Sequence, residues 1–553
     1  MAILAILRDH AQPGCKLASR SPALMTWWLL AALTALMVAP VIAFDMPAMN
    51  DYPNHLARMY LLADWGTPRQ NPYYFVPFTI SPNLAMDIVV TALSRLFDVA
   101  TATKAFLILS QLLIVTGAIA LEIEVKGRHQ FAGFAAAAML YSLPFAWGFL
   151  NFEFGMGLAL WGLAAWFRFG DRGVALRLAV HAVFSALLFL SHLMAFGLYG
   201  AILGFSAAHD LCAVKFDAKR ALRMFALLAS PALAIMAITT MFAGPSPSAD
   251  SHWSAIAKIV SLFNLLYSYD PMVSVTMTFA LSGVTAYLIF SRQLTIAPVG
   301  KWIAAGLLML IILLPFRLRG GDYLEVRTAL GAILILPAFL NLAPASTMIR
   351  ATPSIVLGAI ALINVWQTSV QWRIAQPEYV AMRASFAQLE RGSYVLLGYS
   401  KGYDKASDQA RTMPIATSTA LAAHFAGAFV PTLFTIPGQQ PLQVCPQLAR
   451  LALGKTSDYV PVAYPILAAV AEGAPLADTP PHVRDWTHDY DYLYLVGPQS
   501  ENPMPGRLRL LTQSTLFALY AIVKAPNDAG VAQIRAAPQD QGGGGRAECD
   551  LHP

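Results

Sequence analysis

The residues best suited to chemistry lie in one short stretch, Met49-Asn-Asp-Tyr-Pro-Asn-His-Leu-Ala-Arg58, directly after the first long apolar run. The carboxylate of Asp51 could take a proton from an attacking hydroxyl or bind a metal ion. His55 and Arg58 are three residues apart, so a helix places them on one face, where they could bind a phosphate. The plainer interpretation is structural: Pro53 suits the first turn of a helix, and Asp51 would then cap it. The residues alone leave both interpretations open.

A second polar cluster is Arg317-Leu-Arg-Gly-Gly-Asp-Tyr-Leu-Glu-Val-Arg327. It holds three arginines on what we predict to be the outer side of a membrane, against the usual positive-inside bias. Charges in such a place need a reason, and binding an anion is one. The alternative is a local set of salt bridges, because Asp322 and Glu325 lie beside the arginines. The three arginines are Arg317, Arg319 and Arg327.

The composition identifies the scaffold that must position these residues. The chain has 553 residues, of which 57% are hydrophobic and only 12% charged. Soluble domains carry about 25% charged residues. Apolar runs long enough to span a membrane recur from residue 25 to residue 370. The net charge of +6 comes from basic residues dispersed between these runs, which indicates membrane orientation rather than nucleic-acid binding.

We expect about eleven transmembrane helices. The first apolar run, residues 25–44, follows a basic stretch but is longer than the apolar core of a signal peptide, so we expect a retained signal-anchor. The further candidate spans are 102–121, 131–148, 152–168, 175–190, 193–208, 222–242, 275–291, 302–316, 326–343 and 352–370.

Basic residues in the short loops predict the orientation, with residues 1–24 as a cytoplasmic N-terminal segment. Residues 84–98 contain Asp87 and Arg95, and we expect them to form an interfacial helix inside a long first outer loop, 45–101. This topology puts several polar residues at the outer side, among them Asp51, Glu153, His192 and the three arginines of the second cluster. The basic residues of the inner loops are Lys126, Arg128, Arg168, Arg172, Arg177, Lys215, Lys219, Arg220, Arg223, Arg292, Lys301 and Arg350.

The chain changes character after the last span. Residues 376–390 are typical of an amphipathic helix, and three short runs are typical of buried strands. We therefore expect a small extracytoplasmic α/β domain over residues 371–535, beyond a membrane domain over 25–370. Residues 536–553 are of low complexity and predict a disordered tail. The three strand-like runs are 393–399, 490–496 and 518–523.

Common catalytic and nucleotide-binding motifs are absent from the sequence. We find no Walker loop, no GxGxxG before a helix, no HExxH and no GxSxG. ATP-driven transport and nucleotide-cofactor chemistry therefore have no support from the sequence, and no cofactor is indicated with certainty.

Taken together, these features resemble the GT-C superfamily of polytopic membrane glycosyltransferases. The resemblance covers about residues 25–370 and rests on the number of helices, the aspartate after the first span, the long first outer loop and the outer C-terminal domain. The superfamily includes protein mannosyltransferases, oligosaccharyltransferases and lipid A aminoarabinose transferases. The segment Asn50-Asp-Tyr-Pro-Asn-His-Leu-Ala-Arg58 also resembles bacterial members of unassigned function.

The resemblance implies a function in the bacterial inner membrane. The chain would move a sugar from a polyprenyl-phosphate-linked donor to an extracytoplasmic acceptor, with Asp51 as general base and membrane lipids around it. His55 and Arg58, or the second arginine cluster, would balance the phosphate charge as it leaves. Glu153 and His192 would support the site. A divalent metal is possible, although Asn50 stands where the family commonly has a second acidic residue.

Two other classes of function remain open. A transporter would use Asp51, Glu153 and His192 along a proton or substrate path. Transporters, however, usually have a site near mid-bilayer and often inverted repeats, whereas the charged residues here cluster at one face. A non-catalytic envelope scaffold would use only the outer domain, for partner proteins.

Overall fold

The structure is a computed structural model of the chain. It describes residues 21–77, 80–213, 217–241, 251–267, 269–318, 321–343, 346–400, 406–453, 461–474, 479–497 and 501–524. Most of the expected N-terminal segment, the expected tail and Arg319 lie outside the described residues.

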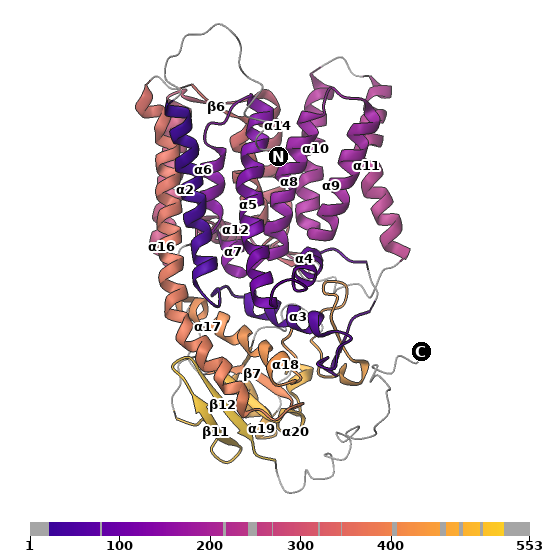
Figure 1. Ribbon diagram of the computed structural model, residues 1–553, viewed down its shortest axis with the longest axis vertical. Helices are drawn as coiled ribbons and strands as arrows, with labels where there is room; N and C mark the ends of the chain where they lie inside the picture. Colours follow the sequence, from indigo (N-terminus) through magenta and orange to yellow (C-terminus); the bar gives the residue numbers. More distant parts are fainter. Residues whose placement is uncertain are drawn as a thin grey trace.

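A helical bundle occupies one end of the molecule and a small sheet domain the other (Figure 1). Six helices of the described chain are long and apolar enough to cross a membrane, so the chain is an integral membrane protein. The count of eleven spans stays a prediction. The six helices are α2 (Ser21–Ala43), α5 (Val99–Lys126), α9 (Val174–Ser191), α11 (Ala218–Met241), α13 (Pro271–Phe290) and α16 (Thr347–Ser385).

Further helices complete the bundle, and small residues bring them close together. A side chain at Gly157 would start 2.6 Å from Leu113 Cβ, and one at Gly117 would start 2.8 Å from Leu160 Cβ. These glycines let α5 and α8 pack with their backbones in near contact, as is common between membrane helices. The further helices are α6 (Ala132–Met139), α7 (Leu143–Trp147), α8 (Leu150–Arg168), α10 (Leu193–Cys212), α14 (Pro298–Leu313), α15 (Leu324–Ile335) and η1 (Leu336–Phe339).

The long loop 45–101, which we predict to be the first outer loop, contains helices α3 (Tyr52–Asp64) and α4 (Ala85–Leu93), which lie between the bundle and the sheet domain (Figure 1). Nine residues make α4 too short to span a membrane. Asn151 of α8 holds α4 in place, because its side chain accepts from the Met86 N–H at 2.7 Å and donates to the Asn83 carbonyl at 2.7 Å.

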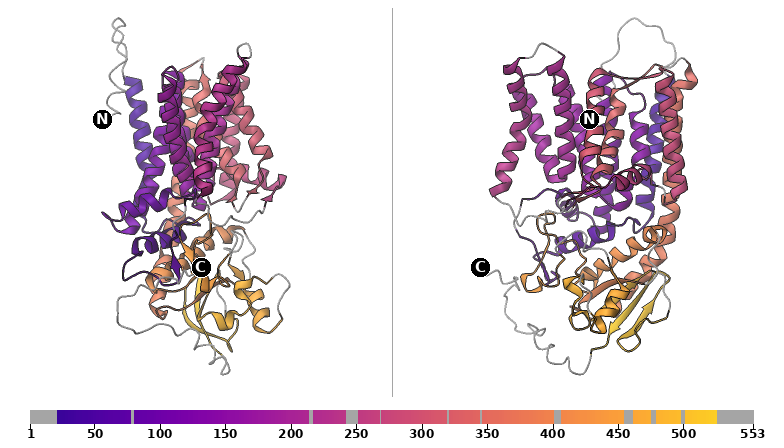
Figure 2. Two further views of the ribbon diagram at one scale, coloured as in Figure 1. Left: turned by 90° about the vertical axis from the view of Figure 1, so that its right-hand side faces the viewer. Right: turned by 180° about the vertical axis from the view of Figure 1, so that it is seen from behind.

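Helix α16 runs without interruption from the bundle into the sheet domain (Figures 1 and 2). Its 39 residues continue through Pro353 and Pro377. The domain boundary expected at 370/371 therefore falls inside a helix, and the amphipathic helix expected at 376–390 is largely its last part. Periodicity did not reveal this continuity, because the pattern changes where the helix leaves the bundle.

The sheet domain is built on five strands in the order β11-β12-β10-β7-β9. Strands β7, β9 and β10 are parallel, and β11 and β12 are added antiparallel. The three runs expected to be strands correspond to β7, β10 and β12. The five strands are β7 (Val395–Tyr399), β9 (Val462–Ala463), β10 (Tyr492–Val496), β11 (Leu508–Gln513) and β12 (Phe517–Ile522).

Short elements complete the described chain. They are α12 (Ala255–Phe263), α17 (Ala406–Ser418), α18 (Ala422–Phe425), α19 (Tyr464–Ala471), α20 (Trp486–Asp489), β1 (Tyr74–Phe75), β2 (Ser251–His252), β3 (Leu294–Ile296), β4 (Arg317–Leu318), β5 (Gly321–Asp322), β6 (Leu340–Leu342), β8 (Gln443–Val444), η2 (Phe386–Gln388), η3 (Thr419–Leu421), η4 (Pro446–Leu448) and η6 (Pro481–Val483).

The loop 45–101 and the C-terminal region form one interface. The amide of Asn54 donates to the Thr432 carbonyl at 2.6 Å and accepts from the Phe434 N–H at 2.8 Å. Asn71 donates to the Ala423 carbonyl at 2.8 Å. Two asparagines of one loop thus bond to backbone groups more than 350 residues away, so α3 and the C-terminal region share one side of the bundle.

This arrangement sharpens the prediction of orientation. We expect a cysteine introduced at the exposed Arg509 of β11 to react with a membrane-impermeant maleimide in intact cells, because the sheet domain is predicted to lie outside. A cysteine at the exposed Arg128, between α5 and α6, serves as the control and should react only after lysis. The experiment uses a background in which the four native cysteines, Cys15, Cys212, Cys445 and Cys549, are replaced by serine. The reverse labelling pattern would overturn the predicted topology.

Candidate functional site

Asp51 stands at the start of α3 with its backbone held against the turn before α8. The N–H groups of Asn50 and Asp51 donate to the carbonyls of Ala146 and Trp147, both at 3.0 Å. The Asp51 side chain makes no capping hydrogen bond, so the interpretation of Asp51 as an N-cap is wrong. Its carboxylate makes no hydrogen bond to any other residue that the structure describes. The backbone of Asp51 is therefore fixed by hydrogen bonds, whereas its half-buried carboxylate is available to bind or react with another molecule.

Burial changes the acidity of this carboxylate. It raises the pKa of Asp51 to about 7, because the charged form loses water. The positive charge of Arg327 lowers this pKa, and the negative charge of Asp322 raises it. A carboxyl group that titrates near neutral pH has the property expected of a general base.

Arg327 is the cation of the site. Its guanidinium lies 4.0 Å from the centre of the Phe149 ring and 5.6 Å from that of Phe152, close enough for cation–π attraction. Its Nη1 is 2.9 Å from Nε2 of His192. The side chain is buried, and its charge also acts on Glu153.

Three residues singled out in the sequence thus interact with a fourth, Arg327, although four separate segments carry them. Asp51, Glu153, His192 and Arg327 come from loop one, α8, the α9–α10 turn and α15. This proximity was expected from the predicted topology, and the interactions above agree with it. What the four residues do stays a prediction.

His192 contributes no positive charge to the group. Its Nδ1 lies 3.1 Å from the Met194 N–H, and its Nε2 faces Arg327, which can only donate. Both ring nitrogens therefore face donors, whereas a neutral imidazole has one unprotonated nitrogen. A neutral ring can therefore accept a hydrogen bond from Met194 or from Arg327, but not from both. A protonated ring could accept from neither, because both of its nitrogens would carry hydrogen.

Arg58 is in a different environment from the one that phosphate binding requires. It is fully buried, and its Nε and Nη2 donate to the Asp87 carboxylate at 2.8 and 3.2 Å. Its Nη1 donates to the side chain of Gln440. The guanidinium is therefore committed to joining α3, α4 and the C-terminal region. This geometry disfavours the expected role of Arg58 in binding the donor phosphate.

His55 is also unsuited to binding an anion. Its ring is buried and packs edge-on against Phe434, with 5.1 Å between the ring centres. Burial and the nearby charge of Arg58 hold the pKa of His55 well below its usual value, although a contact with the Gly148 backbone partly opposes them. The ring is therefore neutral, and its Nδ1 is buried without a partner in the described structure.

Of the two arginines of the second cluster that the structure describes, Arg327 belongs to the group around Asp51 and Arg317 does not. Arg317 pairs across the β4–β5 hairpin with Asp322, with its Nε at 2.5 Å from Oδ1. The salt-bridge alternative therefore holds for Arg317. Arg319 cannot be placed, since it lies outside the described residues.

Sequence reasoning missed the aromatic side chains around Arg327. Tyr323 adopts a left-handed backbone conformation, with φ of +60°, and its ring lies 5.0 Å from Trp147 and 6.2 Å from Phe149. A signal was present in the sequence, because the turn Trp147-Gly-Phe-Leu-Asn-Phe-Glu-Phe places four aromatic residues around Glu153.

The described residues do not fit a metal centre. No three His, Cys, Asp or Glu side chains among them gather in a group that would hold a metal ion. Asp51 has Asn50 beside it and faces the charge of Arg327. The divalent metal that the family resemblance allows therefore finds no ligand set among the described residues.

Comparison with known proteins gives only distant structural likenesses. No family model and no curated protein sequence matches the chain. The fold is similar to the crystal structure of ArnT from Cupriavidus metallidurans in the apo state, with 13% identity and a TM-score of 0.48. It is similar to the same protein bound to undecaprenyl phosphate, with 12% identity and a TM-score of 0.47. The alignments cover 91% and 92% of this chain and the whole of both ArnT chains.

The ion pair of Arg58 gives a prediction on stability. Arg58→Leu should destabilise the protein by about 3–5 kcal/mol, because it leaves the buried carboxylate of Asp87 unpaired. Thermal unfolding in detergent measures the change. The double variant Arg58→Leu/Asp87→Leu should recover much of the loss, and Arg95→Leu, an exposed change nearby, should have little effect. A stable Arg58→Leu protein that had lost affinity for a phosphate donor would instead make Arg58 a ligand.

The contact between Gly148 and Asp51 gives a second prediction. Gly148 has φ of +88°, and a methyl group there would start 3.0 Å from Asp51 Cβ. Gly148→Ala should therefore destabilise the protein by about 1–2 kcal/mol through backbone strain and push Asp51 away. Gly127→Ala is the matched control, because Gly127 has φ of +71° but open space around it. Equal activity of the two variants would show that the contact does not position Asp51.

Proposed function

We propose that the chain is a membrane glycosyltransferase that moves a sugar from a polyprenyl-phosphate-linked donor to an extracytoplasmic acceptor. One observation carries the proposal: the Asp51 carboxylate has no hydrogen-bond partner in the described structure and lies within the field of the buried Arg327. An unsatisfied carboxylate beside a fixed cation is costly to maintain, and such features concentrate at functional sites.

The reaction would proceed by displacement at the sugar. An acceptor hydroxyl attacks the anomeric carbon and gives its proton to the Asp51 carboxylate. The bond between that carbon and the phosphate oxygen breaks, and the polyprenyl phosphate leaves with the electron pair. A base contributes typically a factor of 10²–10⁴ to such a transfer.

Arg327 would stabilise the charge on the departing phosphate. It is already desolvated, so it need not lose water during the reaction, and Phe149, Phe152 and His192 hold it in place. Fixed charges in a site with little water stabilise developing charge more strongly than charges in solution. Arg317 would orient the hairpin before α15 rather than contact the donor, because Asp322 already pairs with it.

The donor class comes from the resemblance of the sequence to the GT-C superfamily. One of the two similar crystal structures has undecaprenyl phosphate bound. At a TM-score of 0.47 this likeness adds no weight of its own. The cytoplasmic N-terminus and the extracytoplasmic C-terminal domain belong to the same proposal, since the acceptor must reach Asp51 from the outer side.

Replacing Asp51 tests the proposal most directly. Asp51→Asn keeps the shape of the side chain but removes the base, so we expect transfer to fall by about 10²–10⁴-fold with normal folding. Because Asp51 is not a cap, Asp51→Ala should also fold normally. Asp98→Asn is the control, since Asp98 does cap a helix, accepting from the Thr101 N–H at 3.0 Å. Transfer by purified Asp51→Asn at the wild-type rate would remove the general base from the mechanism.

The pH dependence of transfer gives an independent test. Transfer should rise with pH through about 7, where the half-buried Asp51 carboxyl group loses its proton. Arg327→Gln removes the charge that lowers this pKa, so it should move the midpoint to higher pH as well as slow the reaction. The raised pKa also means that Asp51 contributes most stability at low pH and loses it as the pH rises through about 7. A pH profile with the same midpoint in both proteins would contradict the pairing of Arg327 with Asp51.

A further inference from the structure

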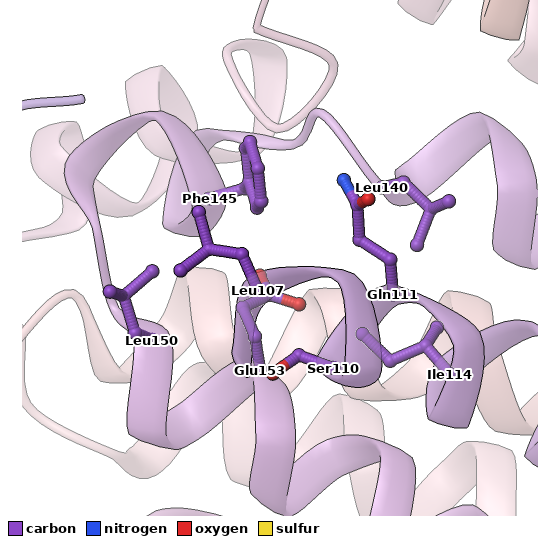
Figure 3. A pocket seen from close by; sticks show the side chains of 8 residues that line it. All are labelled: Leu107, Ser110, Gln111, Ile114, Leu140, Phe145, Leu150 and Glu153. Carbon is purple, nitrogen blue, oxygen red and sulfur yellow. The ribbon is translucent and has the colours of Figure 1, made fainter. Parts of the chain in front are cut away.

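A small cavity lies inside the bundle next to Glu153, between α5, the α6–α7 segment and α8. Figure 3 shows it surrounded by mostly apolar side chains, with three polar ones among them. The space open to the centre of a water molecule is about 10 Å³. The lining residues are Leu107, Ser110, Gln111, Ile114, Leu140, Phe145, Leu150 and Glu153.

Two of the polar side chains have unsatisfied atoms at this cavity. Both the nitrogen and the oxygen of the Gln111 amide are buried without a hydrogen-bond partner, and so is Oε1 of Glu153. Gln111 is 1% exposed and Glu153 is 3% exposed, so solvent at the surface cannot satisfy them. The Tyr141 hydroxyl donates its hydrogen to the Met37 carbonyl at 2.5 Å. Its oxygen lies beside the Gln111 amide and can accept from one of the two amide N–H bonds at most, so the second N–H and the amide oxygen still lack a partner.

The third polar residue is already satisfied. The Ser110 hydroxyl donates to the Phe106 carbonyl of its own helix at 2.8 Å. The unmet hydrogen-bonding capacity at the cavity is therefore one amide donor group, one amide acceptor and one carboxyl oxygen. These groups sit on α5 and α8, the pair of helices whose glycines bring their backbones close together.

Unsatisfied buried polar atoms around a cavity are characteristic of internal hydration. Leaving a polar group buried without a partner costs free energy, and proteins usually avoid this cost by including ordered water. A water site needs about one probe sphere of space, 10–15 Å³, and two to four polar partners. The cavity meets both requirements for a single water molecule. A cavity lined only by apolar groups would instead stay dry.

We propose that this cavity binds one ordered water molecule, held by Gln111 and Glu153. The water donates to Oε1 of Glu153 and accepts from, or donates to, the Gln111 amide. It joins α5 to α8 and fixes one side of the Glu153 carboxyl, while the charge of Arg327 acts on the same group. Gln111 is thus a positioning residue for Glu153. This inference is independent of the proposed function, and its test needs no activity.

A structure at a resolution that reveals ordered water tests the site directly. In the full-length wild-type protein we expect one density peak within hydrogen-bond distance of both Gln111 and Glu153 Oε1. The peak should be lost in Gln111→Leu. An empty cavity, a direct contact between the two side chains, or a peak whose coordination and strength identify a metal ion would overturn the proposal. A peak that persists unchanged in Gln111→Leu would also overturn it.

A double-mutant cycle on unfolding temperature tests the coupling through water. Gln111→Leu should lower the unfolding temperature when Glu153 is present and have a much smaller effect in a Glu153→Leu background, because the shared water then has nothing to link. Ser110→Ala is the matched control from the same cavity and should have equal effects in both backgrounds. Equal effects of Gln111→Leu in both backgrounds would show that the two side chains are not coupled. Should Gln111→Leu fail to fold, the wild-type density decides the question.

Discussion

The buried pairing of Arg58 with Asp87 is the interaction on which the junction between the bundle and the sheet domain depends. The guanidinium of Arg58 is fully buried. It donates hydrogen bonds both to the Asp87 carboxylate on α4 and to the Gln440 side chain of the C-terminal region. A buried charge is tolerable only with partners on several sides. The requirement to satisfy this one group therefore brings together α3, α4 and a segment nearly 400 residues further along the chain. Asp51 stands at the start of α3, and its position follows from the same requirement.

The polar residues of the first loop divide into two kinds of environment. Asn54, Arg58 and Asn71 have their hydrogen-bonding groups occupied by distant parts of the chain, as expected of residues that hold an interface together. The carboxylate of Asp51 has a fixed backbone and no such partner. The polar residues of this loop therefore have different roles. Asn54, Arg58 and Asn71 hold the interface together, whereas the Asp51 carboxylate remains available for chemistry.

The sequence predicted the helical membrane scaffold because long apolar runs have few alternatives in a membrane. It also predicted that Asp51, Glu153, His192 and Arg327 face the same side, since positive loops determine orientation. The sequence did not distinguish Arg58, which is held in an interface, from Arg327, which lies near Asp51. Whether an arginine side chain is paired depends on partners that are distant in the sequence. Gln440 is such a partner, and nothing in the local sequence of Arg58 points to it.

The local patterns were also misleading where tertiary contacts decide. Asp51 before Pro53 has the spacing of a capped helix start, yet the backbone of the neighbouring turn holds this segment instead. Residues 371–376 lie between an apolar and an amphipathic pattern, which suggests a linker, yet the hydrogen-bonded helix continues through them. The change in pattern marks a change of environment, from bundle to sheet domain, rather than a break in the backbone.

Because α16 is continuous, its length determines how the sheet domain is placed relative to the bundle. Each residue of an α-helix advances the chain by 1.5 Å and rotates it by about 100°. The number of residues between the last span and the sheet therefore determines both the distance of the sheet domain from the bundle and the face that it turns toward α3. A flexible linker would have fixed neither. The molecule can accept changes of length in its surface loops, but in α16 a single added residue would turn the interface side of the sheet domain away from the first loop.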